Sequence, residues 1–66
     1  MNVTINGDAR EIPDTLSVAA LLLHLKIQAG RVAVERNLEI LPREKWESTV
    51  LVSGDRLEIV HFVGGG

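Results

Sequence analysis

The chain has 66 residues, of which 45% are hydrophobic and 24% charged, and its net charge at pH 7 is −2. This length allows one domain at most, and the absence of cysteine excludes disulfides and cysteine-based zinc sites. A net negative chain is a poor partner for nucleic acid, because phosphate neutralisation needs a basic surface.

The chain carries no pattern typical of a membrane or leader segment. Its longest apolar run, residues 18–23, is far shorter than the roughly 20 residues that a membrane span needs. The opening residues MNVTING lack the basic and long apolar regions of a signal peptide. We therefore expect a cytoplasmic protein with no membrane partner.

The first twelve residues predict a β-hairpin. Val3 and Ile5 alternate with polar neighbours, which is typical of a strand. Asn6-Gly7 follows, and both residues accept the positive φ of a tight hairpin turn. Residues 8–12 form the expected second strand, which ends before Pro13 because proline cannot donate to a ladder.

Residues 18–25 predict a helix. Apolar side chains recur at the spacing i, i+3, i+4 and i+7: Val18, Leu21, Leu22 and Leu25. Ser17 is the expected N-cap, and Gly30 is the expected breaker after the helix. Leu23 points away from the apolar face, so it is either a single exposed leucine or a partner contact.

Short elements fill the second half of the chain. Trp46 closes a tight helical turn that Pro42 opens, and we expect it to anchor the edge of an otherwise aliphatic core. The other predicted elements are a strand at 31–35, a turn at Arg36-Asn37, a strand at 38–41, a short strand at 49–52 and a last strand at 56–63.

This order of elements predicts an α+β domain. One helix packs on one face of a mixed sheet, and the compact arrangement is a β-grasp with the first and last strands parallel at the sheet centre. We expect residues 1–63 to form this domain and residues 64–66 to form a flexible tail.

The sequence gives little support for independent catalysis. His24 and His61 lie far apart, and the carboxylates are scattered over polar faces. VGGG at residues 63–66 lacks the lysine and following helix of a phosphate-binding loop. We expect no catalytic residue, bound cofactor or metal in this chain.

The last strand loses its alternation near its end. Leu57 and Ile59 point inward, so Val60 and Phe62 would lie on the opposite face. Two interpretations remain open: an exposed apolar patch that contacts a partner, or a bulge that shifts the register and buries Phe62.

The terminal glycines favour a role outside the fold. Val63 to Gly66 can extend about 13 Å, and a thread without Cβ atoms fits a narrow channel. A carboxylate becomes reactive only after conversion to a mixed anhydride, which requires an ATP-using partner. We expect Gly66 to be the final residue, although a frayed terminus would look the same.

Three features together resemble the ThiS family, the sulfur carriers of thiamine biosynthesis: LPREKW at 41–46, SGDRLEIVHFV at 53–63, and the Gly65-Gly66 end. The resemblance spans the whole chain and implies a ubiquitin-like β-grasp. It implies that a ThiF-like adenylyltransferase, using ATP and magnesium, adenylates the Gly66 carboxylate. A persulfide donor then supplies sulfur to form a thiocarboxylate, and thiazole synthase (ThiG-like) draws sulfur from it.

In this interpretation Gly64 and Gly65 thread into the partner. From the broken alternation we add Val60, Phe62 and Val63 as docking candidates. Three alternatives remain: a sulfur carrier for molybdopterin or a modified tRNA base, a ubiquitin-like modifier joined to lysines through Gly66, and a plain binding module. The tail does not distinguish a sulfur carrier for thiamine from one for molybdopterin or a tRNA base, but PREKW favours thiamine.

Overall fold

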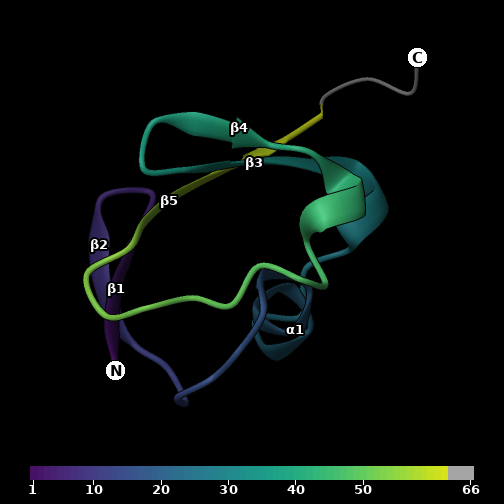
Figure 1. Ribbon diagram of the computed structural model, residues 1–66. Coiled ribbons are helices and arrows are strands. Elements are labelled where there is room, and N and C mark those ends of the chain that lie inside the picture. Colours follow the sequence, from purple (N-terminus) through teal and green to yellow (C-terminus); the bar gives the residue numbers. More distant parts are fainter. Residues whose placement is uncertain (63–66) are drawn as a thin grey trace.

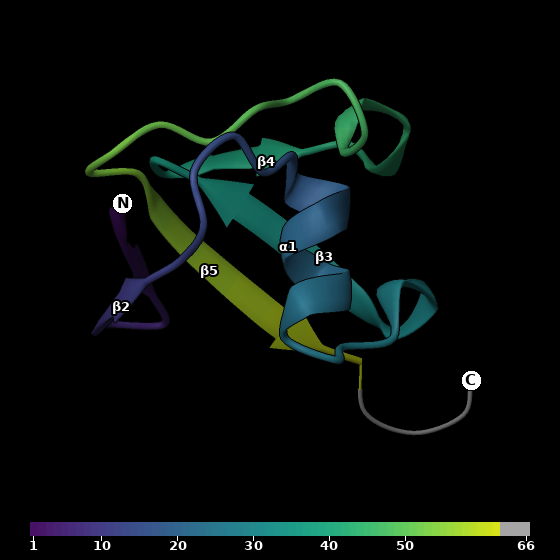
Figure 2. The same cartoon turned by 90° about the horizontal axis from the view of Figure 1, so that it is seen from below.

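A computed structural model describes residues 1–62 of the chain. Five strands form one mixed sheet in the order β2-β1-β5-β3-β4, and one α-helix packs on one side of it (Figures 1 and 2). The elements are β1 (Asn2–Ile5), β2 (Asp8–Glu11), α1 (Val18–His24), η1 (Ala29–Arg31), β3 (Val32–Arg36), β4 (Glu39–Leu41), η2 (Arg43–Lys45) and β5 (Arg56–His61), where η marks a 3₁₀ turn. The predicted α+β, β-grasp arrangement is confirmed.

Strand β5 lies at the centre of the sheet. It pairs parallel with β1 on one side, where Ile5 is opposite Leu57. On the other side it pairs antiparallel with β3, from Val32 opposite His61 to Arg36 opposite Leu57. The chain therefore leaves the fold from the end of a central strand. The predicted tail, residues 64–66, and Val63 lie outside the described residues.

Both hairpin turns place two consecutive residues at positive φ. Asn6 and Gly7 have φ of 51° and 86°, as predicted. The second turn is Asn37-Leu38, with φ of 53° and 73°, so the predicted turn at Arg36-Asn37 is displaced by one residue. Arg36 still pairs with Glu39, which leaves Leu38 in a conformation that leucine disfavours. For this reason the sequence did not reveal the true position of the turn.

Helix α1 starts as predicted. The Ser17 hydroxyl oxygen accepts a hydrogen bond from the Ala20 amide at 3.0 Å and caps the first turn. Val18, Leu21 and Leu22 are buried against the sheet, whereas Leu23 is exposed to solvent.

The helix ends at His24 with Leu25 as its C-cap, close to the predicted end, but Gly30 is not its breaker, contrary to the prediction. Lys26, at φ 60°, takes the left-handed position instead. Its amide donates to the Leu23 carbonyl, and the Ile27 amide donates to the Leu22 carbonyl, which is the bond pattern of a Schellman motif. Gly30 lies in η1, without a positive φ.

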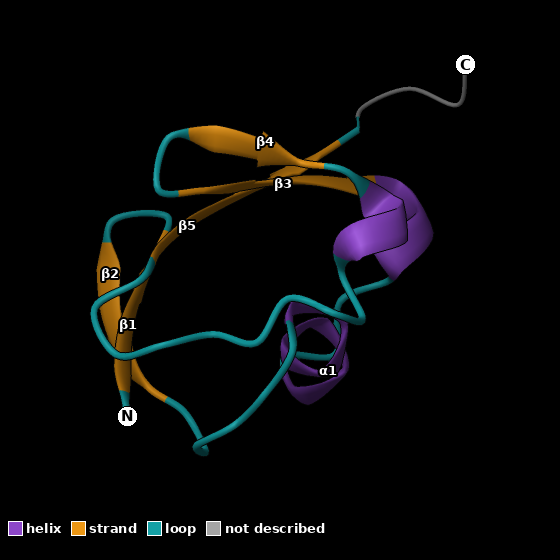
Figure 3. Cartoon of the chain, viewed as in Figure 1, coloured by secondary structure: helices purple, strands orange, loops and turns teal. Residues whose placement is uncertain are grey.

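The core fills the space between α1 and the sheet. It is aliphatic except for Trp46, whose indole Nε1 donates to the Leu41 carbonyl at 3.0 Å. The Arg43 guanidinium lies 4.9 Å from the centre of the indole ring, and its Nη1 donates to the Ala29 carbonyl. This bond joins η2 to η1; Figure 3 shows both turns on the same side of the molecule. Trp46 is therefore the predicted core-edge anchor.

Residues 49–52 are not a strand, contrary to the prediction. Only Val50 forms an isolated bridge, with Ser17. The Leu51 amide donates to Leu16, and Thr49 accepts from the Val18 amide. The segment thus pairs with the chain entering α1 instead of the sheet, although Leu51 is buried as a strand residue would be. No helix in residues 1–62 is long and apolar enough to cross a bilayer.

Candidate functional site: the open sheet face and the end of β5

Strand β5 presents two different faces. Leu57 and Ile59 point toward α1 and are buried, whereas Glu58 and Val60 point to the side of the sheet that no α-helix of residues 1–62 covers (Figures 1 and 2). Phe62 is 58% exposed, and its amide donates to the Arg31 carbonyl at 2.9 Å. The register of the β3–β5 ladder thus continues past the Val32–His61 pair without a bulge, and the structure supports the exposed interpretation of Val60 and Phe62.

Neighbouring strands extend the apolar surface around Val60. Ala33 on β3 lies opposite Val60. Ile40 on β4 points to the same face, because its neighbour Leu41 pairs with the buried Val34. The open-face patch is defined here as Ala33, Ile40, Val60 and Phe62. Sequence reasoning missed Ile40, although assigning Leu41 to the core would have turned Ile40 outward.

Two carboxylates interrupt the open-face patch, and one of them, Glu35, lies directly opposite Ile40. Glu35 lies directly opposite Glu58 across the β3–β5 ladder, and the ion pairs of residues 1–62 include neither. Like charges in directly opposed positions destabilise a sheet. The open face therefore combines an apolar surface with negative charge.

The turn residue Asn6 clamps β5 near its carboxyl end. Its amide Nδ2 donates to the Ile59 carbonyl at 3.1 Å, and its Oδ1 accepts from the Ile59 amide at 2.7 Å. These two bonds continue the β1–β5 contact beyond Leu57. Asn6 thus fixes the direction in which the chain leaves the sheet, a role that the Asn6-Gly7 turn pattern did not reveal.

Asp55 fixes the other end of β5. Its buried carboxylate accepts hydrogen bonds from the Val52 amide at 2.9 Å, from Asn37 Nδ2 at 3.1 Å and from Arg36 Nε at 3.0 Å. Burial alone would raise the pKa of Asp55, but these donors and the Arg36 charge outweigh it and lower the pKa below 3.8. Asp55 is therefore a structural anion.

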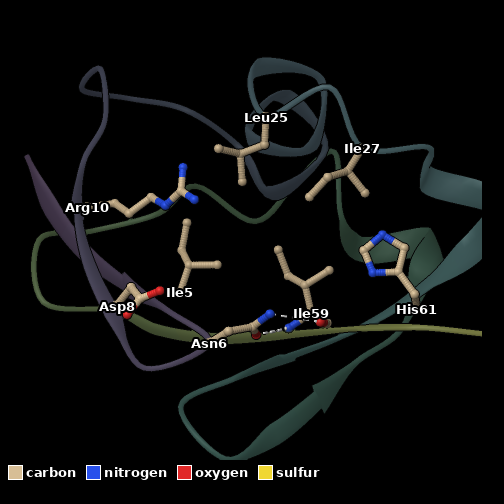
Figure 4. A pocket seen from close by; sticks show the side chains of 8 residues that line it. All are labelled: Ile5, Asn6, Asp8, Arg10, Leu25, Ile27, Ile59 and His61. Atoms are coloured by element: carbon tan, nitrogen blue, oxygen red, sulfur yellow. Dashed lines mark hydrogen bonds between the residues drawn. The ribbon is translucent and has the colours of Figure 1, made fainter.

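A hollow of about 210 Å³ lies on the helix side of the sheet, beside the end of β5 (Figure 4). Asp8, Arg10 and His61 lie at its edge, and its lining includes no hydroxyl, thiol or amine. The other residues that line it are Ile5, Asn6, Leu25, Ile27 and Ile59. It is smaller than typical ligand pockets of roughly 300–1,000 Å³.

The structure therefore describes two of the predicted site residues, Val60 and Phe62, which share the open face. Val63, Gly64, Gly65 and Gly66 lie outside the described residues. His24 is at the end of α1 and His61 at the end of β5, and residues 1–62 contain no cluster of three or more metal-ligating side chains. The candidate site is thus a docking face next to the chain exit.

A mixed sheet with one helix on one face and the last strand at its centre defines a ubiquitin-like β-grasp protein. The family model described as "ThiS family" matches residues 3–66, and the chain belongs to this family. The crystal structure of a thiamine biosynthesis protein (ThiS) from Geobacter metallireducens aligns over the full length of both chains, with a TM-score of 0.87 and 42% identity.

Curated relatives include sulfur carriers of similar length and longer thiazole synthases. The sulfur carrier protein ThiS of Bacillus subtilis is 41% identical over 63 residues, which is 94% of this chain and 96% of that protein. A thiazole synthase of Paramagnetospirillum magneticum is 46% identical over all 66 residues, and another from Magnetococcus marinus is 35% identical. The chain spans about a fifth of the length of these two thiazole synthases.

Proposed function

We propose that this protein carries sulfur for thiazole formation in thiamine biosynthesis, through a thiocarboxylate at Gly66. The observation that carries the proposal is the near full-length match to the sulfur carrier protein ThiS of Bacillus subtilis. An ATP-using, ThiF-like adenylyltransferase with magnesium converts the Gly66 carboxylate to an acyl-adenylate and releases pyrophosphate. The terminal sulfur of an enzyme persulfide then attacks the acyl carbon and displaces AMP. A thiol reduces the resulting acyl disulfide, which leaves the thiocarboxylate on Gly66 and a disulfide between that thiol and the donor.

The chain itself contributes an extended tail, a docking surface and one terminal carboxylate. Four residues follow Phe62, and an extended chain of this length spans about 13 Å. Gly64 and Gly65 pass through the enzyme's channel, where a Cβ would crowd the reacting carbonyl. Val60, Phe62 and Val63 contact the enzyme beside the channel. The protein is a co-substrate of its partners, and the cofactors belong to those enzymes.

Thiazole synthase is the proposed acceptor of the sulfur. Two relatives whose printed name is thiazole synthase contain a segment similar to this whole chain. Segments that occur together in one polypeptide elsewhere often act together, which supports this partner. The proposed adenylation consumes ATP, which supports a cytoplasmic location, and we propose that location for this protein.

Intact-mass spectrometry tests the proposal directly. The purified protein is incubated with a ThiF-type enzyme, ATP, magnesium and a persulfide donor. We expect a mass gain equal to replacing one oxygen by sulfur, localised by fragmentation to Gly66 and absent after removal of Gly65 and Gly66. No gain, under conditions in which the Bacillus subtilis carrier reacts, contradicts the proposal.

Other thiolation products and protein modification are separated by further readouts. A carrier for molybdopterin or tRNA thiolation would acquire the same mass but would not support thiazole formation with a thiazole synthase. A ubiquitin-like modifier would form high-molecular-weight conjugates in cells that disappear when Gly66 is deleted.

A further inference from the structure

The β3–β4 turn carries a large apolar side chain in a strained position. Leu38 has φ 73° and is 85% exposed. The second position of such a two-residue turn favours glycine, because a Cβ in left-handed backbone is disfavoured. Leu38 thus combines backbone strain with an apolar side chain in water, and neither feature helps the fold.

Strained residues that persist without a structural benefit are candidates for function. Two residues further along, Ile40 is 76% exposed on the open face. Ile40 lies diagonally across from Ala33, which is opposite Val60. Leu38 thus extends the exposed apolar surface from Ile40 to the turn, with Glu35 directly opposite Ile40.

We propose that Leu38 and Ile40 form the outer part of the surface on which the adenylating enzyme docks. This inference rests on the proposed function and adds the hairpin to the candidates Val60, Phe62 and Val63. The strain at Leu38 is retained because the leucine side chain contacts the enzyme.

The length of the tail restricts where this enzyme sits. Gly66, the adenylation site in the proposed function, lies four residues after Phe62, so the active site that receives its carboxylate lies within about 13 Å of Phe62. From the His61–Val32 pair to the Leu57–Arg36 pair the β3–β5 ladder covers four residue steps, or about 13 Å. A standard interface covers roughly 800 Å² on each partner, so one enzyme reaches both the chain exit and the hairpin.

Steady-state adenylation kinetics with the full chain and a ThiF-type enzyme test the inference. Leu38→Gly relieves the strain and removes the contact, so we expect a higher Tm together with a KM raised about fivefold or more. The kcat should not change, because the carboxylate and its thread are intact. Ile40→Thr should raise the KM similarly while keeping a β-branched strand residue.

Leu23→Gln is the matched control. Leu23 is 78% exposed but lies on α1, on the other side of the sheet. We expect its KM to equal that of the wild type. If Leu23→Gln raised the KM as much as Leu38→Gly, exposed leucines in general would matter, and the assignment to the hairpin would be overturned.

Two other results would overturn the inference. The first is an unchanged KM for both Leu38→Gly and Ile40→Thr. The second is an effect confined to sulfur transfer to thiazole synthase, which would assign the hairpin to that enzyme instead. In both cases the wild-type protein is still adenylated, so the proposed function is unaffected. If the wild type itself is not adenylated, the proposed function fails, and the inference fails with it.

Discussion

Arg36 contacts Asp55 through two nitrogens: Nε and Nη2 each lie 3.0 Å from Oδ2 of a carboxylate that is almost fully buried. We expect Asp55→Asn to lower the free energy of unfolding by about 2–3 kcal/mol, because it leaves a partly buried guanidinium without its anion. Urea unfolding at pH 7 measures this loss. Asp14→Asn is the control, since the Asp14 pair with the N-terminus is exposed, and such pairs contribute little. Equal losses in both variants would contradict the role of Asp55.

The lowered pKa of Asp55 also predicts how stability depends on pH. Above the ordinary carboxyl pKa of about 3.9, the ionised form is favoured in the folded state, and its contribution is present in full. As pH falls below this value and through the lower folded-state pKa, the contribution is lost. The difference in unfolding free energy between wild type and Asp55→Asn should therefore be constant near neutrality and shrink in acid. A difference that stays constant into acid would contradict this.

Asn6 offers a test of how β5 is held next to the chain exit. Asn6→Gly keeps the positive φ of the turn at no steric cost but removes both side-chain bonds to Ile59. We expect a loss of roughly 1–2 kcal/mol and faster hydrogen exchange at the Ile59 amide. Exchange at Val34, whose bonds do not involve Asn6, should change only as much as global stability does. Unchanged protection of Ile59 relative to Val34 would show that the clamp is dispensable.

Local chemistry was sufficient to predict much of the fold. The Asn6-Gly7 turn, the Ser17 cap and the i, i+3, i+4, i+7 face of α1 each depend on neighbours in the sequence, and all three were correct. Trp46 was placed correctly because a lone tryptophan in a small aliphatic chain has few other positions.

The errors arose where tertiary contacts overrode local preference. Lys26 and Leu38 occupy left-handed positions that local rules assign to glycine or asparagine, so the residue that breaks the helix and the second turn were both misassigned. Residues 49–52 have strand composition, but their backbone partners belong to the segment before α1. No pattern within those four residues indicates this.

The candidate site was predicted only in part for the same reason. The alternation of polar and apolar residues breaks after Ile59 within a single strand. The sequence alone therefore indicated Val60 and Phe62 as candidates for the exposed face. Alternation with Leu41 would have placed Ile40 on the outer face, but its position next to Ala33 and the Glu35–Glu58 pair depend on the register between strands, which a single sequence does not specify.

Lys26 provides a test of the Schellman assignment. Lys26→Gly removes the Cβ from a residue at φ 60°, so we expect a gain of about 0.5–1 kcal/mol after the entropy cost of glycine in the unfolded chain. Gln28→Gly is the control, because Gln28 has φ −74° and should only lose stability. Thermal unfolding of both variants measures the difference. A Lys26→Gly variant that melts no higher than the wild type would contradict strain at this position.

Val60 tests the docking face with little change to the fold. Val60→Thr keeps the shape and β-branching of the side chain and adds a hydroxyl to a 58% exposed position. We expect unfolding free energy to change by less than about 0.5 kcal/mol. Desolvation of that hydroxyl in the complex should weaken binding to the adenylating enzyme about fivefold or more.

Val52→Thr makes the same chemical change at a similarly exposed position, 54%, in the segment before β5 and away from the open-face patch. Titration calorimetry of each variant against a ThiF-type enzyme compares them under identical conditions. Because both substitutions add one hydroxyl at similar exposure, a difference in Kd reports position alone. Equal Kd values for the two variants would exclude Val60 from the contact surface and leave the tail as the main determinant of recognition.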